Sequence, residues 1–358
     1  MNTRTRNLMT LALLWLAMPY CLNAQDGSSE LVQRIEAVSR QAKSADTSKA
    51  YSDIVKECDA LLLEKLETES HREHLKTLLA WTLDKRAVSR IDLAEQFRKA
   101  DNTPQADQIM QQVMQDFARS IENNPQRWQT PLHRGTLYAE QGDYEKAEAD
   151  FTTVINLQPG SKKAIFNRAE IRYQLKKHAA ALSDYQTLVE VDPNDVQSIS
   201  GRAHCLLAMG NPDDALRDYD RVVRKRSKDG WALINRSDAH LALQQWQEAA
   251  DDMQAATTLQ RNGEFNRRLA WLLATCPDES IADGKKSLLV AKTAIEITGE
   301  TVENLDTLAA AYAAAGEFER ARDVHSRVIA MQQSDDPASS VKQAAYENNE
   351  RYQEKFDR

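Results

Sequence analysis

An arginine and an aspartate recur together along this chain at a fixed interval and with a fixed separation. The pairs are Arg134–Asp150, Arg168–Asp184, Arg202–Asp218 and Arg236–Asp252. A constant interval of about 34 residues is the sequence signature of stacked repeats of one supersecondary unit. The interval defines four copies, at residues 128–161, 162–195, 196–229 and 230–263.

Three further positions in the copies keep the size of their side chains. The eighth position is small (Gly135, Ala169, Ala203, Ser237), the twentieth is alanine (Ala147, Ala181, Ala215, Ala249), and the twenty-fourth is large (Phe151, Tyr185, Tyr219, Met253). Small residues at fixed places let two helices approach closely, and a large residue fills the groove beside them. The pattern therefore indicates a packed pair of helices in each copy.

The apolar spacing within each copy has the 3.6-residue period of two helices of about fourteen residues each. Short turns join them, and only 11 glycines and 9 prolines occur in 358 residues, which argues against a chain of many β-turns. One helical pair cannot bury both of its faces, whereas a stack of pairs can. We therefore predict an all-α solenoid.

The arginine of each pair falls on the first helix and the aspartate on the second. The regular recurrence favours a series of ion pairs along the stack. The alternative is a set of separate exposed charges, which contribute about 0–1 kcal/mol each. Either interpretation makes the repeat architectural and does not indicate an active site.

The first copy carries the residues that characterise a known repeat: a small eighth residue, then Tyr138, Gly142, Tyr144, Ala147, Phe151 and Pro159. In these residues and in its period the chain resembles the tetratricopeptide repeat family. The resemblance implies a helical-hairpin solenoid wound as a right-handed superhelix. The copies depart from the pattern where Arg172 and His240 replace the tyrosine, and where Lys176 and Gln244 replace the glycine. We expect these departures to reduce local regularity.

The flanks of the four copies also read as helical. Residues 30–124 have helical apolar spacing at Leu31–Gln41, Ala50–Leu66, His71–Lys99 and Gln105–Asn123, and Val113 and Phe117 fit a degenerate copy. Residues 264–335 resemble a divergent closing module found at the ends of exported bacterial tetratricopeptide proteins. Residues 336–358 read as a polar C-terminal helix that caps the exposed end.

Residues 1–24 have the organisation of a secretory signal peptide. Arg4 and Arg6 precede an apolar run from Leu8 to Met18, and Ala24 is a small residue before a cleavage point. We expect a periplasmic or secreted protein, with residues 25–29 as a linker. The alternative is an uncleaved anchor, although the run is shorter than the roughly 20 residues of a membrane span.

Composition and motifs narrow the function. A net charge of −8 argues against nucleic-acid binding, which needs a basic surface. Cys58, Cys205 and Cys276 remain after signal cleavage and form no metal motif. His71 and His74 favour a surface pair over a metal site, because no third ligand follows at motif spacing. We expect no catalytic residues, no metal and no cofactor, and hence no enzyme.

The resemblance implies that the first helix of each pair lines a concave groove. The groove positions of this chain are Gln129, His133, Thr136, Glu140, Lys163, Asn167, Glu170, Tyr173, Gln174, Gln197, His204, Trp231, Asn235 and Asp238. Asn167 and Asn235 occupy the same position in alternate copies, where their amides could hold an extended backbone. The alternative is an ordinary solvated surface. The family's carboxylate clamp is not expected, because Leu132 stands where its first lysine belongs.

The function expected from this organisation is a non-catalytic scaffold that binds a protein or peptide partner in the groove. A second class of function is a structural or assembly component of an envelope complex, which would use the ends and the convex face. A third, a subunit that presents substrate to a partner enzyme, has the same sequence features as the first.

Overall fold

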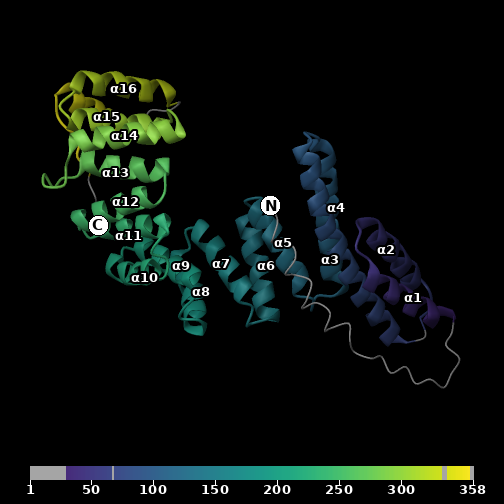
Figure 1. The fold of residues 1–358 in the computed structure, drawn as a ribbon. Coiled ribbons are helices and arrows are strands. Elements are labelled where there is room, and N and C mark those ends of the chain that lie inside the picture. Colours follow the sequence, from purple (N-terminus) through teal and green to yellow (C-terminus); the bar gives the residue numbers. More distant parts are fainter. Residues whose placement is uncertain (1–29, 67, 333–336, 355–358) are drawn as a thin grey trace. The chain divides into compact units, whose positions relative to one another are not determined.

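The computed structural model describes residues 30–66, 68–332 and 337–354. The predicted signal peptide and linker lie outside the described residues. Within the described residues every regular element is a helix, which confirms the all-α prediction. The chain divides into two compact units, one up to Arg134 and the other from Gly135 (Figure 1). The division falls inside helix α5 (Gln129–Glu140).

The first unit contains four complete helices, close to the predicted ranges. They are α1 (Glu30–Ser44), α2 (Ser48–Leu63), α3 (Glu69–Lys99) and α4 (Thr103–Asn123). The expectation that the second helix reaches Leu66 is wrong, since Glu64 already has extended backbone angles. Thr47 and Thr68 cap the starts of α2 and α3 by accepting backbone hydrogen bonds, which explains why these helices begin where they do.

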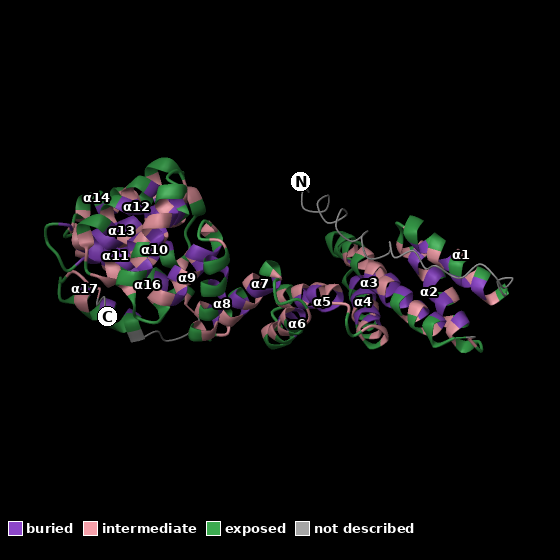
Figure 2. Ribbon diagram, turned by 90° about the horizontal axis from the view of Figure 1, so that it is seen from below, coloured by how far each residue is buried: buried purple, intermediate pink, exposed green. Residues whose placement is uncertain are grey.

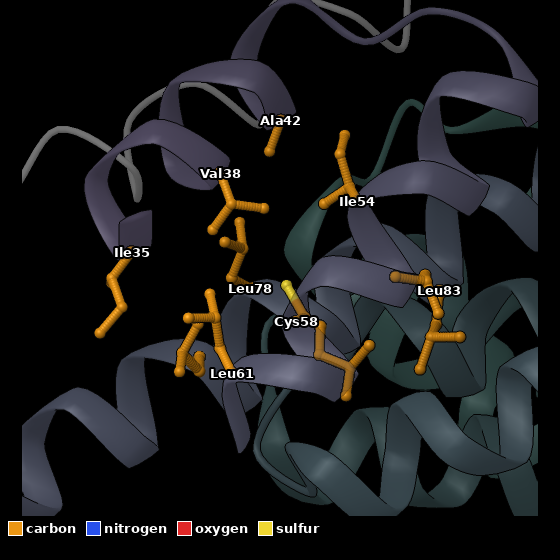
Figure 3. Close-up of a cluster of buried hydrophobic side chains, with 11 residues drawn as sticks. Ile35, Val38, Ala42, Ile54, Cys58, Leu61, Leu78 and Leu83 are labelled. Carbon is orange, nitrogen blue, oxygen red and sulfur yellow. The ribbon is translucent and has the colours of Figure 1, made fainter. Parts of the chain in front are cut away.

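A buried apolar cluster joins α1, α2 and α3, as Figure 3 shows for Val38, Cys58, Leu61 and Leu78. The cluster forms because each helix presents one apolar face at helical spacing. Cys58 is fully buried and free. Burial, together with the charges of Asp59 and Glu57, raises the pKa of the Cys58 thiol to about 12, so the thiol stays protonated at neutral pH.

Helices α3 and α4 form an elongated copy of the repeat. Val113 and Phe117 are fully buried, as the degenerate copy requires. Asp116, which lies one repeat period before Asp150, accepts hydrogen bonds from Arg86 Nη2 at 2.6 Å and from Arg90 Nη1 at 2.9 Å. Because α3 has 31 residues, its arginines lie 30 and 26 residues before the aspartate. In the four copies the arginine and the aspartate are sixteen residues apart, so that spacing does not identify this pair.

The second unit continues as antiparallel helical pairs. Its helices are α6 (Tyr144–Leu157), α7 (Lys162–Gln174), α8 (His178–Val191), α9 (Val196–Ala208), α10 (Pro212–Lys225), α11 (Gly230–Ala242), α12 (Trp246–Leu259), α13 (Gly263–Thr275), α14 (Gly284–Thr298), α15 (Val302–Ala314), α16 (Phe318–Met331) and α17 (Pro337–Glu347). Buried residues form a stripe along these helices (Figure 2). The alanines at the twentieth position are fully buried, so each pair packs closely.

Helices α7, α9 and α11 each begin at a side-chain cap. Ser161, Asp195 and Asp229 accept backbone hydrogen bonds at the starts of α7, α9 and α11, and each lies one full repeat period after the last. Asn262 caps α13 one position earlier than that period predicts from Asp229. The register of α13 is therefore displaced by one position relative to the four copies, and the residues on its inner face are displaced with it.

The predicted arginine–aspartate ion pairs form in three copies. Arg168 bonds Asp184, Arg202 bonds Asp218 and Arg236 bonds Asp252, each through two guanidinium nitrogens at 2.6 to 3.0 Å. The aspartates are only 4% to 5% exposed. The prediction of an ion-pair series over separate exposed charges is confirmed for these copies.

Each of these arginines also reaches the preceding repeat. Arg202 Nη1 donates to Gln186 Oε1 at 2.7 Å, and Arg236 Nη1 donates to Asp220 Oδ1 at 2.9 Å. One guanidinium therefore joins the two helices of its own pair and the second helix of the pair before it. This arrangement explains why an arginine, with its planar fork of donors, recurs at this position.

The turns inside the pairs share one backbone conformation. Gly142, Gly210 and Gly316 have positive φ angles of 76° to 81°, and Lys176 and Gln244 have φ of 59° at the equivalent position. The expectation that Lys176 and Gln244 reduce local regularity is wrong for the backbone, since both adopt the left-handed conformation of the glycines. The cost is conformational strain, because this region is unfavourable for residues with a Cβ atom.

We expect Lys176→Gly and Gln244→Gly each to raise the free energy of unfolding of the second unit by about 0.5–1 kcal/mol. Both side chains are exposed, so little packing is lost. Urea unfolding monitored by circular dichroism measures the change. Gly142→Ala is the matched control and should destabilise the same unit, and no gain from either glycine would show that the turns are unstrained.

The C-terminal end of the second unit is covered by α17, as predicted. Tyr346 is fully buried in a cluster with Leu305, Ala309 and Val328, and Arg322 Nη1 donates to the Tyr346 carbonyl at 2.8 Å. The prediction of one helix over residues 336–358 is wrong in extent, since α17 ends at Glu347. Asn349 follows with a left-handed φ of 57°, a conformation that terminates a helix.

Candidate functional site

The candidate site lies on the first helices of the second unit. We define the inner-face cluster as Glu170 and Tyr173 of α7, His204 of α9, Asn235 and Asp238 of α11, and Arg268 of α13. Glu170, His204 and Asp238 occupy the same position in successive copies. Helices α7, α9 and α11 are the first helices of successive pairs (Figure 1). Since the pairs stack with a constant period, we infer that these side chains form a row across them.

Buried tyrosines of the second helices contact the side chains of this row. The hydroxyl of Tyr185 on α8 donates to Glu170 Oε1. The ring of Tyr219, at the same position of α10, lies 5.6 Å from the ring of His204 in an edge contact. The Tyr219 hydroxyl is buried and has no hydrogen-bond partner among the described residues. The tyrosine at the twenty-fourth position thus fills the core and also contacts, and so orients, the side chain at the ninth position.

His204 is the centre of the cluster. Its ring lies 6.3 Å from the ring of Tyr173, and the side chain of Asn235 lies close to it. Burial lowers the pKa of His204, and the neighbouring Asn235 side chain and the charge of Glu170 offset part of that effect. The imidazole is therefore neutral at neutral pH, with one donor and one acceptor nitrogen.

The row continues onto α13. Asp238 forms an ion pair with Arg268. Trp231, which is 47% exposed, packs its ring edge-on against Phe265 at a centroid distance of 4.9 Å. Neither α13 residue was among the predicted groove positions, because the shortened step before α13 displaces it from the four copies. The caps at Asp229 and Asn262 are the signal that would have found them.

Gly201 explains why asparagine occupies the sixth position only in alternate copies. A Cβ atom at Gly201 would lie 2.4 Å from ring atoms of Tyr185, so this position cannot carry a side chain without displacing that ring. Asn167 and Asn235 flank it on α7 and α11 and are half-buried. The interrupted asparagine pattern therefore follows from the packing of the twenty-fourth position.

The structure brings only part of the predicted set together. Lys163, Gln174 and Gln197 lie exposed on α7 and α9, and Gln129, Thr136 and Glu140 lie on α5. His133 is bound in the first unit, where its Nδ1 lies 2.8 Å from Asp84 Oδ1. Asp84, which sequence reasoning missed, is completely buried. This contact gives His133 a structural partner within the first unit.

The chemistry available at the cluster is hydrogen bonding and aromatic contact. Among the residues that the structure describes, no group of three or more His, Cys, Asp or Glu is arranged to hold a metal ion. In the same residues, no helix has the length and apolar character needed to cross a membrane. Cys205, beneath the cluster, is a fully buried free thiol, and burial raises its pKa to about 12.

A family model described as the tetratricopeptide repeat matches residues 132–196 and 201–267. The matched part of the chain consists of tetratricopeptide repeats. The matched residues contain the inner-face cluster apart from Arg268 and include all three ion pairs described above.

Solved structures of tetratricopeptide repeat proteins are similar to this chain. A protein from Parabacteroides merdae superimposes with a TM-score of 0.55 at 15% identity, covering 73% of this chain and 99% of that one. A thermophilic protein from Thermus thermophilus has a TM-score of 0.42 at 19% identity, covering 51% and 98%. At these identities the likeness to the first structure shows the fold alone.

One curated protein is similar to a short part of this chain. It is a UDP-N-acetylglucosamine–peptide N-acetylglucosaminyltransferase from Giardia intestinalis, 34% identical over 96 residues. The match covers 27% of this chain and 6% of the relative's length. Because the match covers so little of the relative, it supports similarity of the repeats only. The transferase activity is a property of that protein.

Proposed function

We propose that the inner face of α7, α9, α11 and α13 binds an extended segment of a partner protein without catalysing a reaction. The tetratricopeptide fold is a protein–protein interaction scaffold, which supports the general class. The observation that carries the specific proposal is the inner-face cluster. The first helices of four successive pairs present hydrogen-bonding side chains in one row, and contacts with the adjacent helices hold these side chains in place.

The cluster favours a polar segment in an extended conformation. Neutral His204 and Asn235 offer both donors and acceptors, as a peptide backbone requires. Glu170 and Asp238 place carboxylates on the two sides of His204. The Asp238 carboxylate is paired with Arg268. The exposed ring of Trp231 supplies apolar contact at the edge. A partner segment with uncharged or basic side chains matches this surface best.

The proposal includes export. Its support is the basic, apolar and small-residue order of residues 1–24. The partner would then be a protein of the cell envelope or its surroundings.

The test is capture by the mature protein from its own envelope fraction. We expect the double variant Asn235→Ala with Glu170→Ala to capture the partner at least about tenfold less than the wild type. Gln247→Ala with Glu248→Ala, both exposed on α12, is the matched control and should capture normally. N-terminal sequencing of the same preparation tests export, which predicts Gln25 as the first residue.

A second candidate function is assembly through the outer surface. Val191 at the end of α8 and Leu259 at the end of α12 are 61% and 44% exposed, and both belong to second helices. An exposed apolar side chain on the outer surface offers a contact that a copy or partner could bury favourably. Capture that survives the inner-face variant but fails in Val191→Ser with Leu259→Ser would favour this function over the first.

A further inference from the structure

The inner face extends beyond the inner-face cluster along α13. Arg268, Trp271 and Thr275 are spaced three and four residues apart, so they lie on one face of the helix. Arg268 pairs with Asp238 of α11, which identifies this face as the inner one. Trp271 and Thr275 therefore continue the proposed binding surface towards the C-terminal end of the unit.

A lysine from the chain's own C-terminal helix lies on this extension. Lys342 of α17 is only 8% exposed, and its Nζ donates to Asp306 Oδ2 on α15. The same Nζ lies 4.9 Å from the ring centroid of Trp271 and 5.6 Å from that of Tyr352. A carboxylate and two aromatic rings thus compensate the burial of the ammonium group.

The residues after α17 lie along α13 in the way that a bound peptide would. Trp271 Nε1 donates to Glu354 Oε2 at 2.7 Å, and the Glu354 backbone N–H donates to the Thr275 carbonyl at 3.1 Å. Thr275 is the last residue of α13, so its carbonyl has no partner within the helix. The ring of Tyr352 lies 6.1 Å from that of Trp271. Side-chain and backbone contacts together define how a segment is held.

The contact leaves polar groups incompletely satisfied. Among the described residues, buried Asp306 Oδ1, His325 Nδ1 and Tyr346 Oη have no hydrogen-bond partner. His325 Nδ1 lies 3.8 Å from Asp306 Oδ1, while its Nε2 lies 3.0 Å from the Ser339 carbonyl oxygen. Unsatisfied buried polar atoms cost free energy. A segment that satisfied these atoms would therefore compete with the chain's own residues.

We propose that Trp271, Thr275 and Asp306 form a binding site for a lysine-bearing peptide, which α17 and the residues after it up to Glu354 occupy in cis. The site takes an ammonium group between Trp271 and Asp306, and an aromatic ring with a carboxylate against Trp271. This inference rests on the proposed function and adds the ligand class at one end of the surface. A partner segment with this chemistry binds by displacing the C-terminal residues.

The probe is a fluorescent synthetic peptide with the sequence of residues 337–354, and the readout is anisotropy with the full mature chain. The tethered segment competes at an effective concentration in the millimolar range, so the wild type should bind the peptide weakly. In Lys342→Glu the altered side chain is repelled by Asp306, which frees the site. We expect this variant to bind the wild-type peptide at least about tenfold more tightly than the wild-type chain does. The same peptide with Lys342→Glu should not bind.

Two further variants guard against a misleading result. Because Lys342→Glu alters a buried residue of α17, Arg351→Ala with Glu354→Ala loosens only the segment after that helix, and it should also bind the peptide more tightly than the wild type. Adding Trp271→Ala to Lys342→Glu should abolish binding. Equal affinity for the wild type and both tail variants would overturn the proposal, as would binding that is indifferent to Trp271→Ala.

This result is separable from the test of the proposed function. The probe is the chain's own segment, and Asn235→Ala with Glu170→Ala leaves Trp271, Thr275 and Asp306 unchanged. If partner capture does not depend on the inner-face cluster while the peptide binds as expected, the proposed function fails and the C-terminal site stands. If capture depends on the cluster but the peptide shows no preference, only the C-terminal site fails.

Discussion

Replacing Asp84 with asparagine should lower the free energy of unfolding of the first unit by about 3–5 kcal/mol. The Asp84 carboxylate is completely buried on α3, where it accepts hydrogen bonds from Arg127 Nη2 at 2.9 Å and pairs with His133 Nδ1 at 2.8 Å. Asparagine keeps the shape of the side chain but removes its charge. The Arg127 guanidinium, whose side chain is only 13% exposed, then lacks a compensating anion.

The pH dependence gives this prediction a second measurement. Burial opposes ionisation of Asp84, but the charges and hydrogen bonds of His133 and Arg127 outweigh it and lower its pKa from 3.8 to about 2. Because the folded pKa lies below the unfolded one, the stabilisation is complete above about pH 4 and is lost as the pH falls towards 2. The stability difference between wild type and Asp84→Asn should therefore narrow over that range.

The matched control is Asp92→Asn on the same helix. Asp92 is exposed, and neutralising it should change the free energy of unfolding by less than about 0.5 kcal/mol. Urea unfolding at pH 7, followed by circular dichroism, compares the two variants. Equal effects of the two substitutions would show that the buried contacts of Asp84 do not stabilise the first unit.

Asp218→Ala should destabilise the second unit by about 3 kcal/mol. Its carboxylate is 4% exposed and receives two hydrogen bonds of 2.7 Å from Arg202. Removing it leaves Arg202, whose side chain is 16% exposed, without the anion that offsets its burial. The repeat also loses an ion pair between α9 and α10, so neighbouring repeats should unfold less cooperatively.

A double-mutant cycle with Arg202→Met isolates the pair. We expect a coupling free energy of about 2 kcal/mol, with the double variant more stable than the sum of the single changes predicts. Asp251→Ala, an exposed aspartate on α12, is the control for loss of charge alone. Additive effects of Asp218→Ala and Arg202→Met would contradict a stabilising role for the ion pair.

The repeat could be predicted because each of its determinants is local or recurs at a fixed period. Ala215 and Tyr219 lie four residues apart on one helix face, and their size alone sets how closely the next helix can approach. The same logic located α4, where Val113 and Phe117 keep their places. It failed to extend the site to Arg268, because one position is missing from the step to α13 and a rigid period does not allow for it.

Contacts that join residues far apart in the chain followed no such rule. His133 has the position of a groove residue, yet it pairs with Asp84, which lies 49 residues earlier. Trp271 and Glu354 are 83 residues apart. Neither pair has a spacing that recurs, so only the packed structure brings its members together.

The amino-acid sequence by itself determined the all-α repeat and the arginine–aspartate pairs, because helical periodicity and side-chain size act between near neighbours and repeat with the fold. The tertiary structure decided which inner-face side chains contact one another, where α17 ends, and that residues 337–354 lie against Trp271 and Asp306. These outcomes depend on competition for partners across the folded chain: a buried charge or polar group pairs with whichever complementary group the packing brings within reach.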